Sequence, residues 1–303
     1  MAAGGLTARP VPGRVSWVAA ICAIAAVLLA GIAADVARTP YHHKLSALVH
    51  MSASDGVAAG ARAADPGFAF VPPTSHYDGT YFYAVARDPF ARGVQHTQID
   101  RPAYRYGHAF YGQVVALLSA GYPAAVPFWL LAVSLLAMGV AAACASLLAA
   151  GWGWSPWSGL AVALSPGLLY AVTVDTAEPL VAALLGLSLL AWTRRRLLPA
   201  AVAFAALALT KEPMAAVPVG IGLYELVRIW RRDRQLLPAG WSDPRWRRRA
   251  VGGVAALAAG PVVLLGWLLY VEHVFGVWPL SQSGGLVGAP FSGLRDSLET
   301  AAG

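Results

Sequence analysis

The side chains best suited to chemistry lie in one short stretch, between His76 and Tyr106. Carboxylates, arginines and tyrosines alternate there in the segments His-Tyr-Asp-Gly-Thr-Tyr-Phe-Tyr (76–83), Arg-Asp-Pro-Phe (87–90) and Asp-Arg-Pro-Ala-Tyr-Arg-Tyr (100–106). A carboxylate within hydrogen-bond reach of a hydroxyl can take its proton, and an arginine can bind a phosphate through two parallel hydrogen bonds. Because polar groups are costly inside a membrane, this concentration indicates a site and not a span.

The rest of the chain is strongly apolar. Of its 303 residues, 58% are hydrophobic and 12% charged, whereas soluble proteins carry roughly 25% charged residues. The net charge of +7 comes mainly from arginines between apolar runs, a pattern of membrane topology and not of nucleic-acid binding. Cys22 and Cys144 lie inside apolar runs, so we expect them to pack as small hydrophobic side chains. The composition predicts an all-α polytopic membrane protein with the lipid bilayer as a partner and no nucleic acid.

The apolar runs predict about seven transmembrane helices, each near the length of roughly twenty residues that a bilayer requires. The first run, 15–34, is longer than the apolar core of a signal peptide, which is the alternative interpretation, and we favour an uncleaved anchor. Residues 35–122 form a long loop in which 108–122 is expected to be an interfacial helix. The membrane core is then 123–271, with helices expected at 124–150, 157–174, 178–193, 197–210, 213–230 and 250–271.

Two arginine blocks set the expected orientation. One is Arg194 to Arg196, and the other lies between Arg228 and Arg249. Since short cytoplasmic loops are rich in arginine, both blocks and the tail 1–14 are predicted to be cytoplasmic in a multi-pass protein of the cell (inner) membrane. Residues 35–122 and 272–303 then lie outside the cytoplasm, so the loop that could carry chemistry is predicted to be extracytoplasmic.

Several segments together resemble the GT-C superfamily of bacterial polytopic membrane glycosyltransferases, including mannosyltransferase-like members. The resemblance runs from about residue 76 to residue 294 and rests on motifs at 77–83, 88–89 and 100–105. It also rests on Asp-Thr-Ala-Glu-Pro (175–179), Leu-Thr-Lys-Glu (209–212) and Phe-Gly-x-x-Pro (275–279). Family members usually have more than seven spans, so further spans could follow the expected extracytoplasmic segment 272–303.

The resemblance implies a reaction and its partners. The expected donor is a polyprenyl-phosphate-linked sugar, and the acceptor is an extracytoplasmic glycan, lipid or protein of the cell envelope. By motif position, the general base would be Asp78. The alternative is that Asp78, which precedes Gly79, caps a helix or forms a turn. Some members of the superfamily use Mg²⁺ or Mn²⁺, but the sequence contains no readable set of metal ligands and we assign no cofactor.

Other polar residues have a possible place in the same reaction. Arg101, Arg105 and Lys211 could neutralise the departing phosphate, although the arginines could instead contact lipid headgroups and Lys211 could form a structural ion pair beside Glu212. Asp175 and Glu178 have the spacing of a helix capping box, with a contact to the donor sugar as the alternative. Tyrosines could stack on a sugar or lie among headgroups, namely Tyr81, Tyr83, Tyr104 and Tyr106.

Two functions of other classes compete with the glycosyltransferase. A transporter or flippase of lipid-linked intermediates would need charges within its spans, whereas the charges here are predicted to lie at the ends of the spans. A non-catalytic membrane assembly subunit would need no complete site. Turnover of a panel of polyprenyl-phosphate sugars by the membrane-embedded protein separates the enzyme from the subunit.

The predicted orientation can be tested by labelling single cysteines in intact cells. A cysteine at Ser75 and one at Glu272 should react with a membrane-impermeant reagent, and one at Gln235 should not. Reaction at Gln235 would contradict the orientation. Failure at Glu272 alone would indicate that 197–210, the shortest expected span, does not cross.

Overall fold

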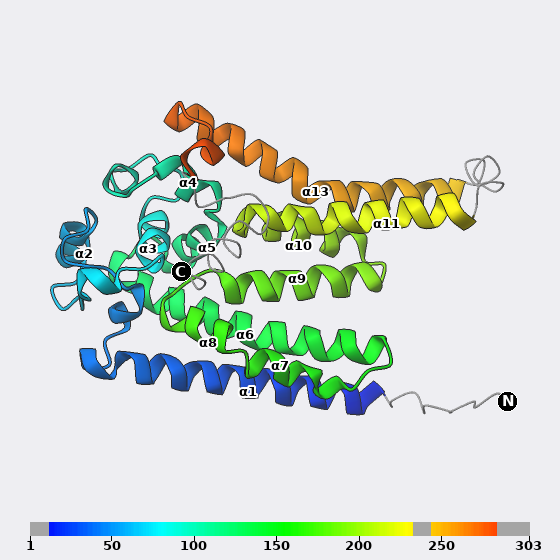
Figure 1. The fold of residues 1–303 in the computed structure, drawn as a ribbon, viewed down its shortest axis with the longest axis horizontal. Coiled ribbons are helices and arrows are strands. Elements are labelled where there is room, and N and C mark those ends of the chain that lie inside the picture. Colours follow the sequence, from blue (N-terminus) through cyan, green and yellow to red (C-terminus); the bar gives the residue numbers. More distant parts are fainter. Residues whose placement is uncertain (1–11, 233–243, 284–303) are drawn as a thin grey trace, which may run out of the picture.

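The computed structural model describes residues 12–232 and 244–283, and helices are the only regular secondary structure in these two ranges (Figure 1). The predicted all-α class is therefore confirmed. Of the predicted terminal segments, 1–11 and 284–303 lie outside the described residues.

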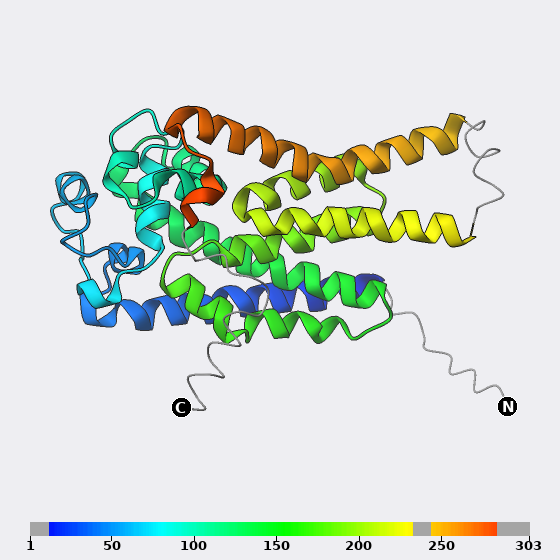
Figure 2. The same ribbon diagram turned by 45° about the horizontal axis from the view of Figure 1, so that its top comes forward.

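Within residues 12–232 and 244–283, three helices are long and apolar enough to cross a membrane. They are α1 (Pro12–Arg38), α6 (Val126–Gly151) and α13 (Pro244–Phe275), and their apolar portions lie within Gly13–Tyr41, Pro123–Gly151 and Ala250–Phe275. In Figures 1 and 2 they run along the length of the molecule together with the shorter helices described next. Apolar helices of this length support a membrane location.

The remaining predicted spans are shorter helices. Residues 157–174 are divided into α7 (Leu160–Ala163) and α8 (Pro166–Thr173). The division falls at Ser165, whose Oγ accepts the backbone N–H of Leu168 at 3.4 Å and caps the second helix. The others are α9 (Glu178–Thr193), α10 (Leu197–Thr210) and α11 (Ala216–Arg232), with 16, 14 and 17 residues. Since these lengths fall short of roughly twenty residues, the count of seven spans stays a prediction.

The helices form one bundle in which the chain passes back and forth between two ends. Helix α6 packs against α1 and α9, and α10 packs against α9 and α13. The turn between α9 and α10 carries Arg194 to Arg196 and lies at the same end as the start of α1, the end of α11 and the start of α13 (Figure 1). Arg194 to Arg196 and the described parts of the second predicted block, at the end of α11 and the start of α13, therefore lie at one end of the bundle. Residues 233–243 of that block lie outside the described residues. We call this end of the bundle the arginine end.

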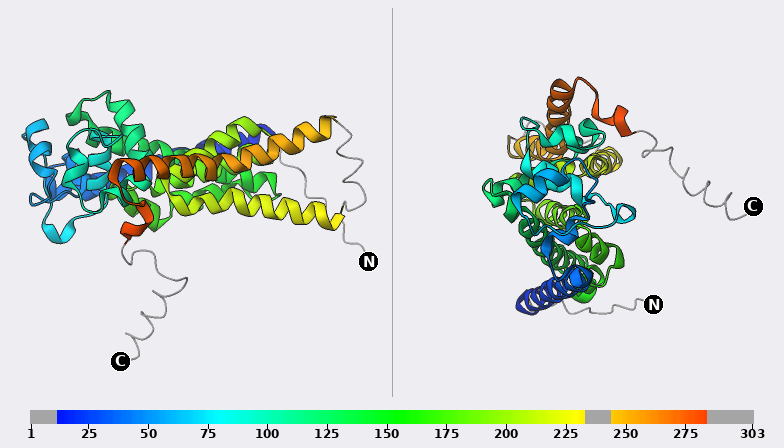
Figure 3. Two further views of the ribbon diagram at one scale, coloured as in Figure 1. Left: turned by 90° about the horizontal axis from the view of Figure 1, so that it is seen from above. Right: turned by 90° about the vertical axis from the view of Figure 1, so that its left-hand side faces the viewer.

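Residues 39–122 fold into a cap over the opposite end of the bundle (Figures 1 and 3). The predicted interfacial segment 108–122 contains one of the helices of this cap, α5. The elements of the cap are short, and they are η1 (Thr39–Tyr41), η2 (Leu45–Val49), α2 (Ala58–Ala64), η3 (Pro73–Ser75), α3 (Gly79–Arg87), η4 (Gln95–Gln98), α4 (Pro102–Gly107) and α5 (Phe110–Ser119).

A buried core joins the cap to the bundle. Phe82 of α3 packs edge-on against Tyr111 of α5, with their ring centroids 5.1 Å apart. The hydroxyl of Tyr111 donates to the backbone carbonyl of Leu130 in α6 at 2.8 Å, so its polar end is satisfied inside the core. On the other side of the cap, Trp267 of α13 donates through Nε1 to the carbonyl of Tyr106 at 2.6 Å. The cap is thus held by α6 and by α13.

Gly79, the first residue of α3, lies close to the backbone of both the cap and the bundle. A Cβ atom at this position would lie 2.6 Å from the carbonyl oxygen of Val49 and 2.7 Å from that of Val174. Both obstacles are backbone atoms from separate segments. Only glycine allows α3 to begin here.

We predict that Gly79→Ala destabilises the protein by about 1–3 kcal/mol, the usual cost of overpacking. The substitution forces α3 away from the two carbonyl groups, and thermal unfolding in detergent should occur at a lower temperature. Gly167→Ala is a matched control, because a Cβ atom added at Gly167 would meet no packed neighbour within 4 Å. Equal stability of the two variants would contradict the proposed close approach.

Candidate functional site

The predicted site residues come together where the cap meets the bundle, at the end opposite the arginine end. They are contributed by the starts of α3, α4 and α9, the loop before α9, and the residue after α10. These segments lie far apart in the sequence, between residues 78 and 212, and the fold places them side by side. We refer to the residues in mutual contact as the polar cluster, and it consists of Asp78, Tyr81, Asp100, Tyr104, Arg105, His108, Glu178, Lys211 and Glu212. Arg101 and Asp175 adjoin it in the sequence, next to Asp100 and three residues before Glu178.

Asp78 lies at the N-cap position of α3, but its side chain makes no capping hydrogen bond. Its Oδ1 instead accepts from Nη1 of Arg105 at 3.1 Å. The side chain is 54% exposed, so a second molecule can reach the carboxylate. The side chain of Asp78 therefore does not cap α3, and the capping interpretation is wrong.

Arg105 holds two carboxylates. Besides Asp78, its Nε atom donates to Oδ1 of Asp100 at 3.3 Å. The guanidinium lies over the ring of Tyr81, with Cζ 3.5 Å from the ring centroid, and the side chain is only 11% exposed. Stacking of this kind suits the planar guanidinium. Most of the charge on Arg105 is thus compensated within the protein, which leaves less of it for a phosphate.

The positive charge of Arg101 is compensated much less than that of Arg105. It precedes α4 with φ of 46°, in the left-handed region, and its Nη1 donates to the backbone carbonyl of Ser283 at 3.3 Å. No carboxylate pairs with it among the described residues. An exposed guanidinium whose charge is not neutralised is the better phosphate ligand of the two.

Lys211 pairs with a different acid from the one next to it in the chain. Its Nζ atom donates to Oε1 of Glu178, at the start of α9, at 2.7 Å. The neighbouring acid, Glu212, lies instead 3.2 Å from Nδ1 of His108. Burial opposes ionisation of Glu212, but the contact with His108 outweighs it and lowers the pKa of Glu212. Sequence reasoning missed His108, which lies 104 residues away from Glu212.

The tyrosines differ in how much of their rings is free. Tyr83 and Tyr106 are 1% exposed and belong to the core, so neither can stack on a sugar. One face of the Tyr81 ring is covered by Arg105. Burial, only partly offset by the charge of Arg105, raises the pKa of Tyr81 to about 12. Tyr104 lies edge-on to the ring of His108, with centroids 5.1 Å apart, and burial likewise raises the pKa of its hydroxyl.

Asp175 is fully buried and has no hydrogen-bond partner among the described residues. It does not cap α9: the N-cap residue of that helix is Ala177, with no capping bond from a side chain. The predicted capping box with Glu178 is therefore not formed. Its backbone has φ of 47°, which is unusual for a residue other than glycine. Burial without compensation raises the pKa of Asp175 well above its ordinary value.

Asp88 has a structural role. Its Oδ1 accepts the backbone N–H groups of Arg92 and Gly93, each at 2.8 Å, and its Oδ2 lies 2.9 Å from Nδ1 of His96. Burial opposes ionisation, but these hydrogen bonds outweigh it and lower the pKa of Asp88. The carboxylate is 4% exposed, so it organises the loop after α3 and is not open to a substrate.

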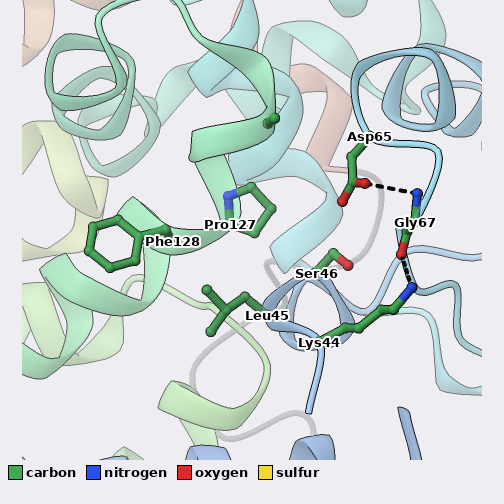
Figure 4. A pocket seen from close by; sticks show the side chains of 8 residues that line it. Lys44, Leu45, Ser46, Asp65, Gly67, Pro127 and Phe128 are labelled. Atoms are coloured by element: carbon green, nitrogen blue, oxygen red, sulfur yellow. Dashed lines mark hydrogen bonds between the residues drawn. The ribbon is translucent and has the colours of Figure 1, made fainter. Parts of the chain in front are cut away.

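Two further features of the described residues bear on ligands. No group of three or more histidine, cysteine, aspartate or glutamate side chains in this part of the chain is arranged to hold a metal ion. A cavity of about 300 Å³ lies between η2, the loop after α2 and the start of α6. Figure 4 shows Lys44, Gly67 and Asp65 joined by hydrogen bonds on one side of this cavity and Phe128 on the other. No residue of the polar cluster lines this cavity.

Comparisons with known proteins add no relative. No protein-family model, curated protein or solved structure matches this chain.

The buried Asp175 generates a prediction on stability and pH. With the folded-state pKa raised, the folded protein binds more protons than the unfolded chain, so stability should fall by up to about 1.4 kcal/mol per pH unit above the ordinary pKa of an aspartate. Asp175→Asn removes this titration and keeps the shape of the side chain. We expect the variant to be more stable than wild type at pH 7 and its unfolding temperature to depend less on pH.

The measurement is thermal unfolding between pH 4 and pH 8, with Asp35→Asn as a control at an exposed carboxylate of α1. Lower stability of Asp175→Asn at every pH would show instead that the ionised carboxylate of Asp175 is needed.

Proposed function

We propose that this protein is a GT-C-like membrane glycosyltransferase that moves a sugar from a polyprenyl-phosphate donor to an extracytoplasmic acceptor of the cell envelope. The observation that carries the proposal is the state of Asp78. Its carboxylate is half-exposed, is held through one oxygen by Arg105, and lies at the end of an apolar helix bundle. A carboxylate fixed in this way and open to solvent suits a general base.

The proposed reaction uses one carboxylate and inverts the anomeric carbon. Asp78 takes the proton of the acceptor hydroxyl as its oxygen bonds to that carbon. The bond between the carbon and the phosphate oxygen breaks, and the polyprenyl phosphate leaves with the electron pair. No second acid is needed, because a phosphate is a good leaving group even without protonation.

Cations near Asp78 support the departure of the phosphate. Arg101 has no carboxylate partner among the described residues, which makes it the preferred phosphate ligand in this proposal. Lys211 and Arg105 are paired with acids, so they contribute mainly by balancing the negative charges of Glu178, Asp78 and Asp100. Arg101 is thus the main phosphate ligand of the three cations, and the proposed reaction stays the same.

The membrane arrangement belongs to the same proposal. Seven spans, an N-terminus in the cytoplasm and a location in the inner membrane would place the arginine end inside and the polar cluster outside. The uncharged interiors of α6, α8, α9 and α10 give no support to a carrier that moves charges through its spans. The cap and its site would then face the compartment in which envelope acceptors are found.

The proposal predicts the effect of Asp78→Asn. The amide can still accept a hydrogen bond from Arg105 but cannot take a proton, so the transfer rate should fall by about 10²–10⁴ while the fold is kept. Asp100→Asn is the matched control, since Asp100 is also a half-exposed partner of Arg105. It should cost no more than about tenfold.

The measurement is transfer from polyprenyl-phosphate sugars by the protein in proteoliposomes. A rate for Asp78→Asn within a few-fold of wild type would exclude Asp78 as the base, and Asp100 would be the next candidate. Equal losses in both variants would mean that the two acids act only by holding Arg105. Absence of turnover by the wild-type protein with every donor would argue for the assembly subunit.

A further inference from the structure

A line of hydrogen bonds enters the polar cluster from the outer part of the cap. It begins at Asp55, whose Oδ2 accepts the backbone N–H of Ser52 at 2.7 Å and lies 2.9 Å from Nδ1 of His76. The other ring nitrogen of His76, Nε2, lies 3.1 Å from the hydroxyl of Tyr81. No motif or spacing in the sequence suggested that these three residues meet.

The chemistry of the three groups fixes the direction of the hydrogen bonds. A carboxylate only accepts, so Nδ1 of His76 carries the hydrogen that Asp55 receives. In the neutral ring Nε2 is then an acceptor for the hydroxyl of Tyr81, which also has the carboxylate of Asp100 as a hydrogen-bond partner. Asp55 therefore sets both the orientation and the tautomer of His76, in the way that a carboxylate orients a functional histidine elsewhere.

Tyr81 connects His76 to the proposed catalytic groups, Arg105 and Asp78. Its ring is the surface on which the Arg105 guanidinium rests, 3.5 Å from the ring centroid, and Arg105 in turn donates to Asp78. The contacts are therefore continuous from Asp55 through His76, Tyr81 and Arg105 to Asp78. The side chains of Asp55 and His76 are 20% and 29% exposed, so both are more shielded from solvent than the half-exposed Asp78.

We infer that Asp55 and His76 are positioning residues, which lock the ring of Tyr81 beneath Arg105 and so fix the direction from which Arg105 holds Asp78. The role in catalysis rests on the proposed function. The mechanical link between His76 and Arg105 does not, since it follows from the contacts alone. The two parts are tested separately.

The link is tested by a double-mutant cycle on thermal stability in nanodiscs, which requires no substrate. His76→Leu removes both hydrogen bonds of the ring, and Arg105→Lys keeps the charge but loses the planar group that stacks on Tyr81. Groups that share a network give non-additive effects, whereas separate sites add. We expect the unfolding temperature of the double variant to be higher than the sum of the two single losses predicts.

The matched control is His43→Leu. His43 also pairs with an aspartate, Asp35, at 3.0 Å, but both side chains are 56% exposed and neither contacts the polar cluster. Its effect should add to that of Arg105→Lys. Additivity of His76→Leu with Arg105→Lys, or equal coupling of the two histidines, would overturn the inference. If His76→Leu fails to fold, Tyr81→Phe replaces it in the cycle, because it removes the hydroxyl that contacts His76 and keeps the ring. If Arg105→Lys fails to fold, Arg105→Gln replaces it.

The catalytic part is tested by steady-state transfer. His76→Leu should lower kcat about ten- to hundredfold, as expected when a catalytic group is misplaced, with KM for the donor changed by less than about threefold. His76→Gln offers an N–H to Asp55 and a carbonyl oxygen to Tyr81, so it should restore most of the rate. A change in KM alone, or no rescue by Gln, would overturn the positioning role. A wild-type protein without turnover refutes the proposed function and leaves the stability cycle as the test of the link.

Discussion

The polar end of this molecule depends on the compensation of one guanidinium. Arg105 is nearly buried, and it is stable there because two carboxylates and the face of a tyrosine surround it. Removal of both carboxylates would leave a shielded charge unpaired, which is more costly than the loss of an exposed ion pair. This single group links the start of α3, through Asp78, to the segment before α4, through Asp100.

The apolar bundle makes such compensation necessary. The interiors of α6, α8, α9 and α10 carry no charged residue, so the acids and bases that these helices position lie at their ends or in the cap. At the cap end, Lys211 with Glu178 and His108 with Glu212 join segments that are 33 and 104 residues apart. These pairs tie α9 and α4 to the short segment after α10, so the electrostatics of the cluster and the packing of the bundle depend on each other.

Much of this arrangement could be predicted from the sequence, because it follows from local composition. The apolar runs gave the helices, and the density of polar residues between 76 and 106 placed Asp78, Tyr81 and Arg105 in one cluster. The pairing of Lys211 could not be predicted, since its choice of Glu178 over Glu212 depends on how α9 and α10 pack. The capping box failed for a different reason: α9 begins at Glu178 itself, so Asp175 lies outside the capping register. The Ser-Pro pair at 165–166 was a readable signal that one predicted span is divided.

In the proposed arrangement of seven spans, the short length of α10 has a consequence for the membrane around it. At 1.5 Å per residue, its 14 residues extend only about 21 Å, whereas the hydrocarbon layer of a bilayer is about 30 Å thick. A hydrophobic mismatch of this size is relieved by thinning of the bilayer or by recession of the helix below the lipid surface. Lys211, directly after α10, would then lie several ångströms deeper than the headgroups. A long-chain lipid phosphate would have to sink to the same depth to meet it.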